Sequence, residues 1–234
     1  STTSGLTLTE KVLTPTELQV NLQICKKELH SDWEAAQMGF SAFDNLPPLF
    51  SDFVIARVAA EVAQATENSI WGGAAAEGNF DGFKTIMQAD GTVVDVTGQS
   101  VTAANVIAEL TKIIDAIPAA VYGSDDLVLY VSTTFAKCYI QAQATLGYAN
   151  LYNAGTTEMN FQGIPMFVTP GLQTNNAVAA RKSNLYFGTG LLNDRNEVKV
   201  IDMADIDGSQ NVRVVMRYTA GVQIGVGADI VLYS

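Results

Sequence analysis

The last fifty residues of this chain read as one β-strand after another. Strand-like runs occupy residues 184–188, 197–201, 211–218, 222–226 and 231–233. In the third run, hydrophobic alternation places Val212, Val214, Met216 and Tyr218 on one face and Arg213, Val215 and Arg217 on the other. This pattern is typical of a half-buried sheet, and no catalytic motif interrupts it. We therefore expect the C-terminal region to form a framework more than a pocket.

The N-terminal segment alternates in the same way, in two runs on either side of Thr14-Pro15-Thr16. The runs cover residues 6–13 and 18–24, and the second places Leu18, Val20, Leu22 and Ile24 on one face. The pattern predicts a β-hairpin arm. Because a lone two-stranded hairpin is only marginally stable in water, we expect the arm to lie on its own subunit or on a neighbour.

The middle of the chain predicts a mixture of helices and strands. Pro47-Pro48 precedes the longest helix candidate, residues 49–68, which would be about 30 Å long at 1.5 Å per residue. A second helix is expected between Thr102 and Pro118, and a third from Thr133 with Ser132 as its N-cap. Strands are expected at 127–131 and 164–168, with loops at 148–162 and 170–183. The fold class is therefore α+β.

Composition favours a large oligomer. Of the 234 residues, 48% are hydrophobic and only 16% are charged, which is below the usual charged share of about 25%. A surface with so little charge is best explained by burial against partner subunits, together with small polar side chains. The net charge of -11 and the scattered Lys and Arg residues argue against nucleic-acid binding through the phosphate backbone.

The sequence contains few residues that could form a catalytic or metal-binding site. His30 is the sole histidine, which excludes a multi-histidine metal site within one chain, and no nucleophile-elbow motif accompanies it to suggest a Ser-His-Asp triad. Asp202, Asp205 and Asp207 before Gly208 resemble a calcium loop, but Met203 and Val214 stand where ligands should be, so an acidic turn is expected. We expect no catalytic, cofactor or metal residues, and no apolar stretch is long enough to cross a membrane.

The order of these features resembles the tailed-bacteriophage major capsid protein family, with the Hong-Kong-97-type fold. The arm, the long helix and the Arg-bearing final strands carry the resemblance, together with three short motifs: Phe80-Asp-Gly-Phe83, Gly163-Ile-Pro165 and Asn184-Leu-Tyr-Phe-Gly188. The resemblance implies an N-terminal arm and E-loop hairpin (1–45), a peripheral domain with a spine helix (46–96), an axial domain (97–193) and peripheral-domain return strands (194–234). Residues 171–183 would form an axial loop.

The resemblance also implies a structural, non-enzymatic role. The chain would assemble with itself through hexamers and pentamers into an icosahedral head that encloses double-stranded DNA without reading its sequence. It would be a virion protein, assembled in the bacterial host cytoplasm, with portal, scaffold or cement proteins of the same virus as further partners. The candidate subunit-interface residues are Leu13, Pro15, Leu18, Val20, Trp33, Arg181, Arg213 and Arg217.

Two alternatives remain open. An encapsulin-like nanocompartment shell would use the same fold but enclose a cargo enzyme, bound through a peptide groove, instead of DNA. A soluble α+β enzyme would need a concave pocket with titratable groups close together.

Overall fold

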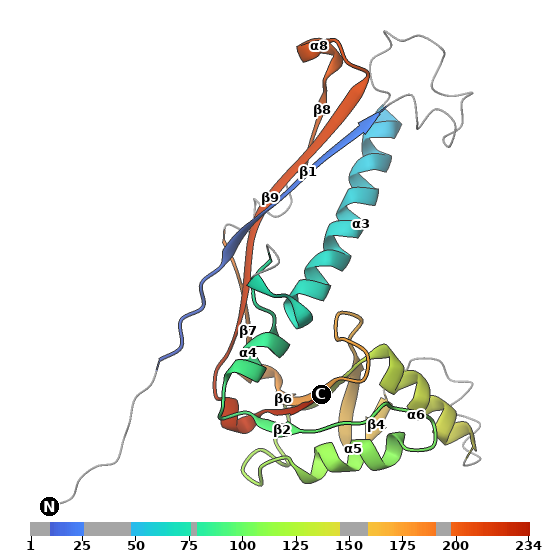
Figure 1. The fold of residues 1–234 in the computed structure, drawn as a ribbon, viewed down its shortest axis with the longest axis vertical. Coiled ribbons are helices and arrows are strands. Elements are labelled where there is room, and N and C mark those ends of the chain that lie inside the picture. The colour runs from blue at the N-terminus through green and yellow to red at the C-terminus, as the bar shows by residue number, and fades with distance from the viewer. Residues whose placement is uncertain (1–9, 26–47, 76–78, 146–158, 191–197) are drawn as a thin grey trace, which may run out of the picture. The chain divides into compact units, whose positions relative to one another are not determined.

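The computed structural model describes residues 10–25, 48–75, 79–145, 159–190 and 198–234 (Figure 1). The chain forms two compact units. The larger unit comprises Ser1–Thr14, Glu67–Gly188 and Gly221–Ser234, and the smaller unit comprises Pro15–Thr66 and Thr189–Ala220. Helix α3 (Pro48–Gly72) and strand β9 (Asn211–Ile224) contribute residues to both units.

The smaller unit is built around β9. Strand β1 (Thr16–Cys25) pairs antiparallel with β9 along one edge, and β8 (Val198–Asp202) pairs antiparallel with it along the other. Val214 therefore has Leu22 as its neighbour on one side and Val200 on the other. The sequence suggested two strands at 211–218 and 222–226, but β9 is one continuous strand of 14 residues.

Helix α3 packs on one face of this sheet. Val54 and Val58 of the helix form a buried cluster with Val212 and Val214, and Val20 and Val200 lie against the cluster. The predicted alternation in β9 is confirmed: the four residues expected inside are buried, whereas Arg213 and Val215 are half-buried and Arg217 is exposed. The predicted helix is also confirmed, and it is longer at its C-terminal end than the predicted 49–68.

The N-terminal hairpin prediction is wrong for the described residues. Residues 10–15 form no strand, and the run that begins at Leu18 pairs with β9 instead of with the preceding run. Residues 6–9 lie outside the described part of the chain. The physical reason is that β9 is long and carries a matching apolar face, so it stabilises β1 far better than a short two-stranded hairpin could.

The larger unit contains a six-stranded mixed sheet in the order β2-β10-β6-β3-β5-β4. Its strands are β2 (Val94–Val96), β3 (Leu127–Val131), β4 (Met159–Phe161), β5 (Ile164–Val168), β6 (Ala177–Arg181) and β10 (Val231–Tyr233). Strand β7 (Leu185–Thr189) follows β6 and pairs with β9. Short 3-10 helices occupy Lys182–Asn184 and Gly227–Asp229.

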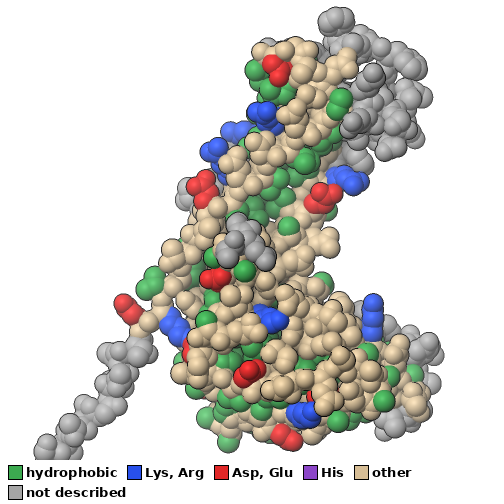
Figure 2. Space-filling model, in the orientation of Figure 1, with side chains coloured by type: hydrophobic (Ala, Val, Ile, Leu, Met, Phe, Trp, Pro, Cys, Tyr) green, Lys and Arg blue, Asp and Glu red, His purple; other side chains and the backbone are tan. Residues whose placement is uncertain are grey.

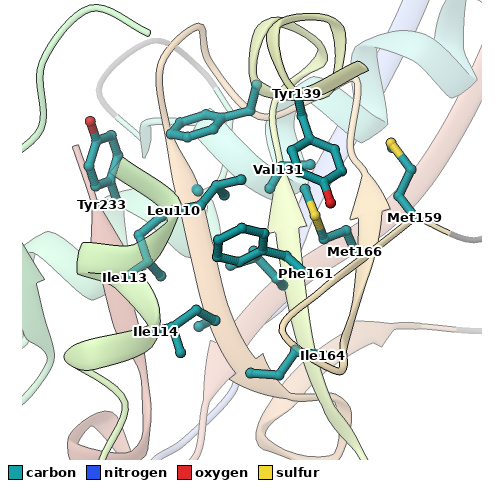
Figure 3. Close-up of a cluster of buried hydrophobic side chains, with 14 of the residues drawn as sticks. Leu110, Ile113, Ile114, Val131, Tyr139, Met159, Phe161, Ile164, Met166 and Tyr233 are labelled. Carbon is teal, nitrogen blue, oxygen red and sulfur yellow. The ribbon is translucent and has the colours of Figure 1, made fainter. Parts of the chain in front are cut away.

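Helices α5 (Val106–Asp115) and α6 (Thr133–Thr145) supply the main core on one face of this sheet. In α5, the buried positions Val106, Leu110, Ile113 and Ile114 recur at helical spacing. Figure 3 shows the side chains of this helix directed toward residues of the strands, among them Phe161 and Ile164. Phe135 of α6 meets Tyr233 edge-on, with ring centroids 5.3 Å apart.

Aromatic rings pack on the other face of the six-stranded sheet. The ring of Trp71 lies 5.0 Å from that of Tyr130 and 5.3 Å from that of Phe83, the first residue of α4 (Phe83–Ala89). Val128 and Val178 on this face are fully buried. The end of α3 and the start of α4 thus cover the second face of the six-stranded sheet.

Residues 170–183, expected to be a loop, contain the central strand β6. Its sequence, Ala-Val-Ala-Ala-Arg, has only one β-branched residue, so propensity does not mark it as a strand. The small side chains suit a strand that lies between β10 and β3 and is buried on both faces. The predicted axial loop at 171–183 is therefore wrong over 177–181, and β4 likewise lies inside the predicted loop 148–162.

Candidate assembly surfaces

The sheet of the smaller unit has a polar face opposite α3, which we call the outer face. On β1 it carries Gln19, Asn21 and Gln23, which stand opposite Arg217, Val215 and Arg213 of β9. On β8, Lys199 stands opposite Val215 and Ile201 opposite Arg213. The alternation that turns valines toward α3 therefore brings three basic residues and three amides together on this face.

Among the described residues, the outer face carries more basic than acidic side chains, although the chain as a whole is acidic. Arg213 Nη2 donates a hydrogen bond to Gln23 Oε1 at 3.3 Å. Arg217 is exposed and makes no hydrogen bond or ion pair with any residue that the structure describes. Glu17, opposite Thr219, adds one acid to the face. Figure 2 shows Lys and Arg side chains gathered over the part of the sheet where β8 and β9 lie.

The described part of the arm, residues 10–14, is attached to the larger unit of its own chain. Leu13 is half-buried against Gly188, where an added Cβ would lie 2.3 Å from Leu13 Cδ2. Gln223 Nε2 donates a hydrogen bond to the Val12 carbonyl oxygen at 3.1 Å. Lys11 Nζ forms an ion pair with Asp90 Oδ2 at 2.5 Å. The hydrogen bond from Lys11, helped by two from Thr92, lowers the pKa of Asp90 to about 2.

The other candidate interface residues lie in different surroundings. Leu18 and Val20 are half-buried on the apolar face of β1, opposite Tyr218 and Met216. Pro15 is exposed. Arg181 of the larger unit forms an ion pair with Asp229 of the same unit. Trp33 and His30 lie outside the described residues. Arg213 and Arg217 are thus the two candidates that the structure brings together on one exposed face.

A second exposed patch lies on the larger unit at β5. Phe167 is 46% exposed and lies on the same face of the sheet as Tyr130, its register partner on β3. Lys182 Nζ lies 4.8 Å from the centre of the Phe167 ring, within the range of a cation–π contact. Tyr130 continues the patch inward, with its ring centroid 6.5 Å from that of Phe167. The sequence does not reveal this patch, because Phe167 and Lys182 come together only through the pairing of β3 with β5 on one side and with β6 on the other.

The buried titratable groups are part of the core. Glu109 accepts hydrogen bonds from Lys112 Nζ and from the Tyr233 hydroxyl, each at 2.8 Å. Burial raises the pKa of Glu109, but these two hydrogen bonds outweigh it and hold that pKa below its ordinary value. Burial also raises the pKa of Tyr233 to about 12. Both groups are therefore locked in one protonation state near neutral pH, which suits a structural role.

The acidic segment after β8 forms a turn, as predicted. Asp202 Oδ1 accepts a hydrogen bond from the Ala204 amide at 3.0 Å, and Asp207 Oδ1 accepts one from the Ser209 amide at 2.9 Å. Between them lies the one-turn helix α8 (Ala204–Asp207), which Gly208 ends with a φ of 73°. The described ranges contain no group of three His, Cys, Asp or Glu side chains that could hold a metal ion. No helix in them is long and apolar enough to cross a membrane.

No family model and no curated protein match this sequence. Solved structures do match. The capsid of an empty GTA particle aligns over 100% of this chain and 78% of its own, with a TM-score of 0.62 and 14% identity. The satellite phage P4 procapsid aligns over 100% of this chain and 83% of its own, with a TM-score of 0.57 and 12% identity. This chain has the fold of a phage capsid protein.

A virus-like particle from Pyrococcus furiosus also shares the capsid fold, over 94% of this chain and 77% of its own, with a TM-score of 0.53 and 12% identity. The predicted resemblance to phage capsid proteins and the α+β class are confirmed. At identities of 12–14%, the likeness concerns the fold, and the functional argument depends on this chain's own surfaces.

Proposed function

We propose that this chain is the major capsid protein of a tailed double-stranded DNA bacteriophage. The observation that carries the proposal is the capsid fold, which extends over the whole chain in the GTA and P4 alignments. The chain would assemble with itself through hexamers and pentamers into an icosahedral head and would enclose the genome without sequence-specific binding. It would do no enzymatic chemistry.

Three properties of the chain support this role. The charged share of 16% suits a subunit whose surface is largely covered by neighbours. The outer face of the smaller unit and the Phe167 patch are exposed in the single chain, and repeated contacts could cover both. The net charge of -11 suits a container that packs DNA without adhering to it. Assembly would take place in the host cytoplasm, with portal, scaffold or cement proteins as further partners.

Within this proposal, the Hong-Kong-97-type divisions are an arm with E-loop at 1–45, a peripheral domain at 46–96 with α3 as spine helix, an axial domain at 97–193 and return strands at 194–234. Leu13, Pro15, Leu18, Val20, Trp33, Arg181, Arg213 and Arg217 are the proposed interface positions. Leu13 and Arg181 contact residues of the larger unit, whereas Arg213 and Arg217 lie together on the outer face, so these two are the best placed to contact a neighbour.

A protein nanocompartment is the second candidate, because the Pyrococcus furiosus virus-like particle shares the fold. The two functions differ in what the shell encloses. An electron micrograph of particles purified from the native source, followed by nuclease treatment and analysis of their content, separates them. We expect nuclease-protected double-stranded DNA. Particles filled with a single enzyme would favour the nanocompartment, and an absence of particles would contradict both.

A further inference from the structure

We infer that the outer face of the smaller unit docks onto an acidic surface of a second copy of this chain, with Arg217 and Arg213 at its centre. The inference rests on the proposed shell function and deepens it, because it names one of the surfaces through which copies would meet. It starts from the uneven distribution of charge over the chain.

The charge of this face opposes that of the chain. Lys199, Arg213 and Arg217 lie on neighbouring strands of one face; among the described residues, Glu17 adds an acid to this face, and Asp207 is close enough to interact electrostatically with Arg213. The whole chain has 24 acidic and 13 basic residues, so the surface of any second copy presents mainly acids. Two copies with a net charge of -11 repel each other over long distances. A local basic face offsets this repulsion where the copies touch and also fixes their register.

The composition of the face suits a protein partner better than a nucleic acid. Three basic residues could neutralise only about three phosphates of a DNA backbone, and affinity that comes from such contacts falls steeply with salt concentration. Gln19, Asn21 and Gln23 offer amide donors and acceptors, and the half-buried Val215 and Ile201 lie among them. Such a mixture of hydrogen-bonding groups, Arg and some apolar surface is typical of protein–protein interfaces.

The basic residues of the outer face also determine which symmetry the contact between copies can have. In a two-fold symmetric dimer through this face, the basic residues of one copy would meet those of the other, and like charges would repel. The face must therefore meet a different, acidic surface of its neighbour. Contacts between unlike surfaces generate rings when the rotation closes, which is the arrangement that pentamers and hexamers require.

Substitutions at Arg217 test the inference because its side chain is exposed and points away from the core. The matched control is Lys137→Glu, since Lys137 is an exposed cation on α6 and its reversal changes the net charge by the same amount. The measurement is the lowest concentration of full-length protein that forms particles, followed by light scattering at about 0.05 M and about 1 M salt. Thermal unfolding of each variant checks that it folds.

At low salt, we expect Arg217→Glu to raise this concentration about tenfold, which corresponds to about 1.4 kcal/mol per contact. Arg217→Gln should have an intermediate effect, while Arg217→Lys and Lys137→Glu should stay within about twofold of the unchanged chain. At about 1 M salt, where the Debye length is about 3 Å, the differences should nearly vanish. This graded dependence on charge is not expected of a residue that only supports the fold.

Arg217→Glu that assembles as readily as Lys137→Glu would overturn the inference and leave the proposed function intact. Normal assembly of Arg217→Glu with loss of retained DNA would also overturn it, because the face would then bind a polyanion. An unchanged chain that forms no particles under any condition would overturn both.

Discussion

Close backbone approaches make single glycines indispensable in the larger unit. A Cβ built on Gly171 would lie 2.2 Å from the carbonyl oxygen of Glu67, and one built on Gly73 would lie 2.4 Å from that of Phe80. Backbone atoms cannot yield as the end of a flexible side chain can. These positions hold the end of α3 against the loops that follow it, so the core around Trp71 depends on them.

Gly171→Ala should therefore lower the free energy of unfolding by about 1–3 kcal/mol, the usual cost of forcing extra volume into a packed site. Gly91→Ala is the matched control, because no atom lies within 4 Å of the Cβ that it would add. Urea denaturation of both variants measures the difference. Equal stability of the two variants would show that the close approach at Gly171 does not exist.

The ion pair between Lys11 and Asp90 makes part of the free energy of unfolding depend on pH. The folded-state pKa of Asp90, about 2, lies below the value of about 3.9 expected in an unfolded chain. The carboxylate therefore stabilises the fold above about pH 4, and this contribution is lost as the pH falls toward 2. Asp90→Asn should flatten the dependence of the unfolding free energy on pH between about 4 and 2.

Lys11→Met should remove most of the same acid dependence, because the hydrogen bond from Lys11 is the main cause of the lowered pKa. The double variant should then resemble either single variant. If Asp90→Asn retains the full slope between pH 4 and 2, other carboxyl groups account for it and the arm is not held in this way.

At the scale of elements, the packing of α3 on β9 organises the smaller unit. Val54 and Val58 are buried against Val212 and Val214, and Thr66 Oγ1 lies 2.9 Å from the Tyr218 hydroxyl oxygen. Strand β9 thus packs against α3 through its apolar face. Its opposite face carries basic residues of the outer face. A substitution on the apolar face of β9 should therefore change the free energy of unfolding. A substitution on the outer face should change the association of copies.

Val58→Ala should cost about 2 kcal/mol of unfolding free energy, because it removes buried methyl groups and leaves a cavity. Val12→Ala is the same chemical change at a side chain that is 69% exposed, and it should be nearly neutral. Chemical denaturation of the two variants makes the comparison. A cost at Val12 equal to that at Val58 would mean that α3 does not pack on the sheet in this way.

The sequence predicted strands well where they show alternation or a run of bulky apolar residues, as in β3 (Leu127–Val131), and poorly where they show neither. The alternation from Val212 to Tyr218 identified a half-buried strand and assigned each side chain to its face correctly. Strand β6 was missed because Ala177, Ala179 and Ala180 carry no periodic signal when every position is buried. The partner of β1 was also missed, because pairing across nearly 200 residues of sequence leaves no local trace.

Capping was predicted only in part. Ser132 precedes α6 and its carbonyl oxygen accepts the amide of Ala136, but its hydroxyl has no hydrogen-bond partner in the part of the chain that the structure describes. Of the candidate interface, the alternation revealed Arg213 and Arg217. Lys199 and the amides Gln19 and Asn21 joined them only once the register of three strands was known.

At the scale of the whole molecule, the low charge content, the capsid fold and the exposed faces lead to the same expectation. A chain of 24.9 kDa with this composition should be found in its native state as part of a much larger assembly. The energy of that assembly would come from many repeated contacts of moderate strength, among them the docking of the basic outer face onto an acidic neighbour.

Sedimentation velocity of the purified full-length chain, over a range of protein and salt concentrations, would show whether such assemblies form. We expect closed particles of megadalton mass in equilibrium with smaller rings. A single species near 25 kDa under every condition would contradict it.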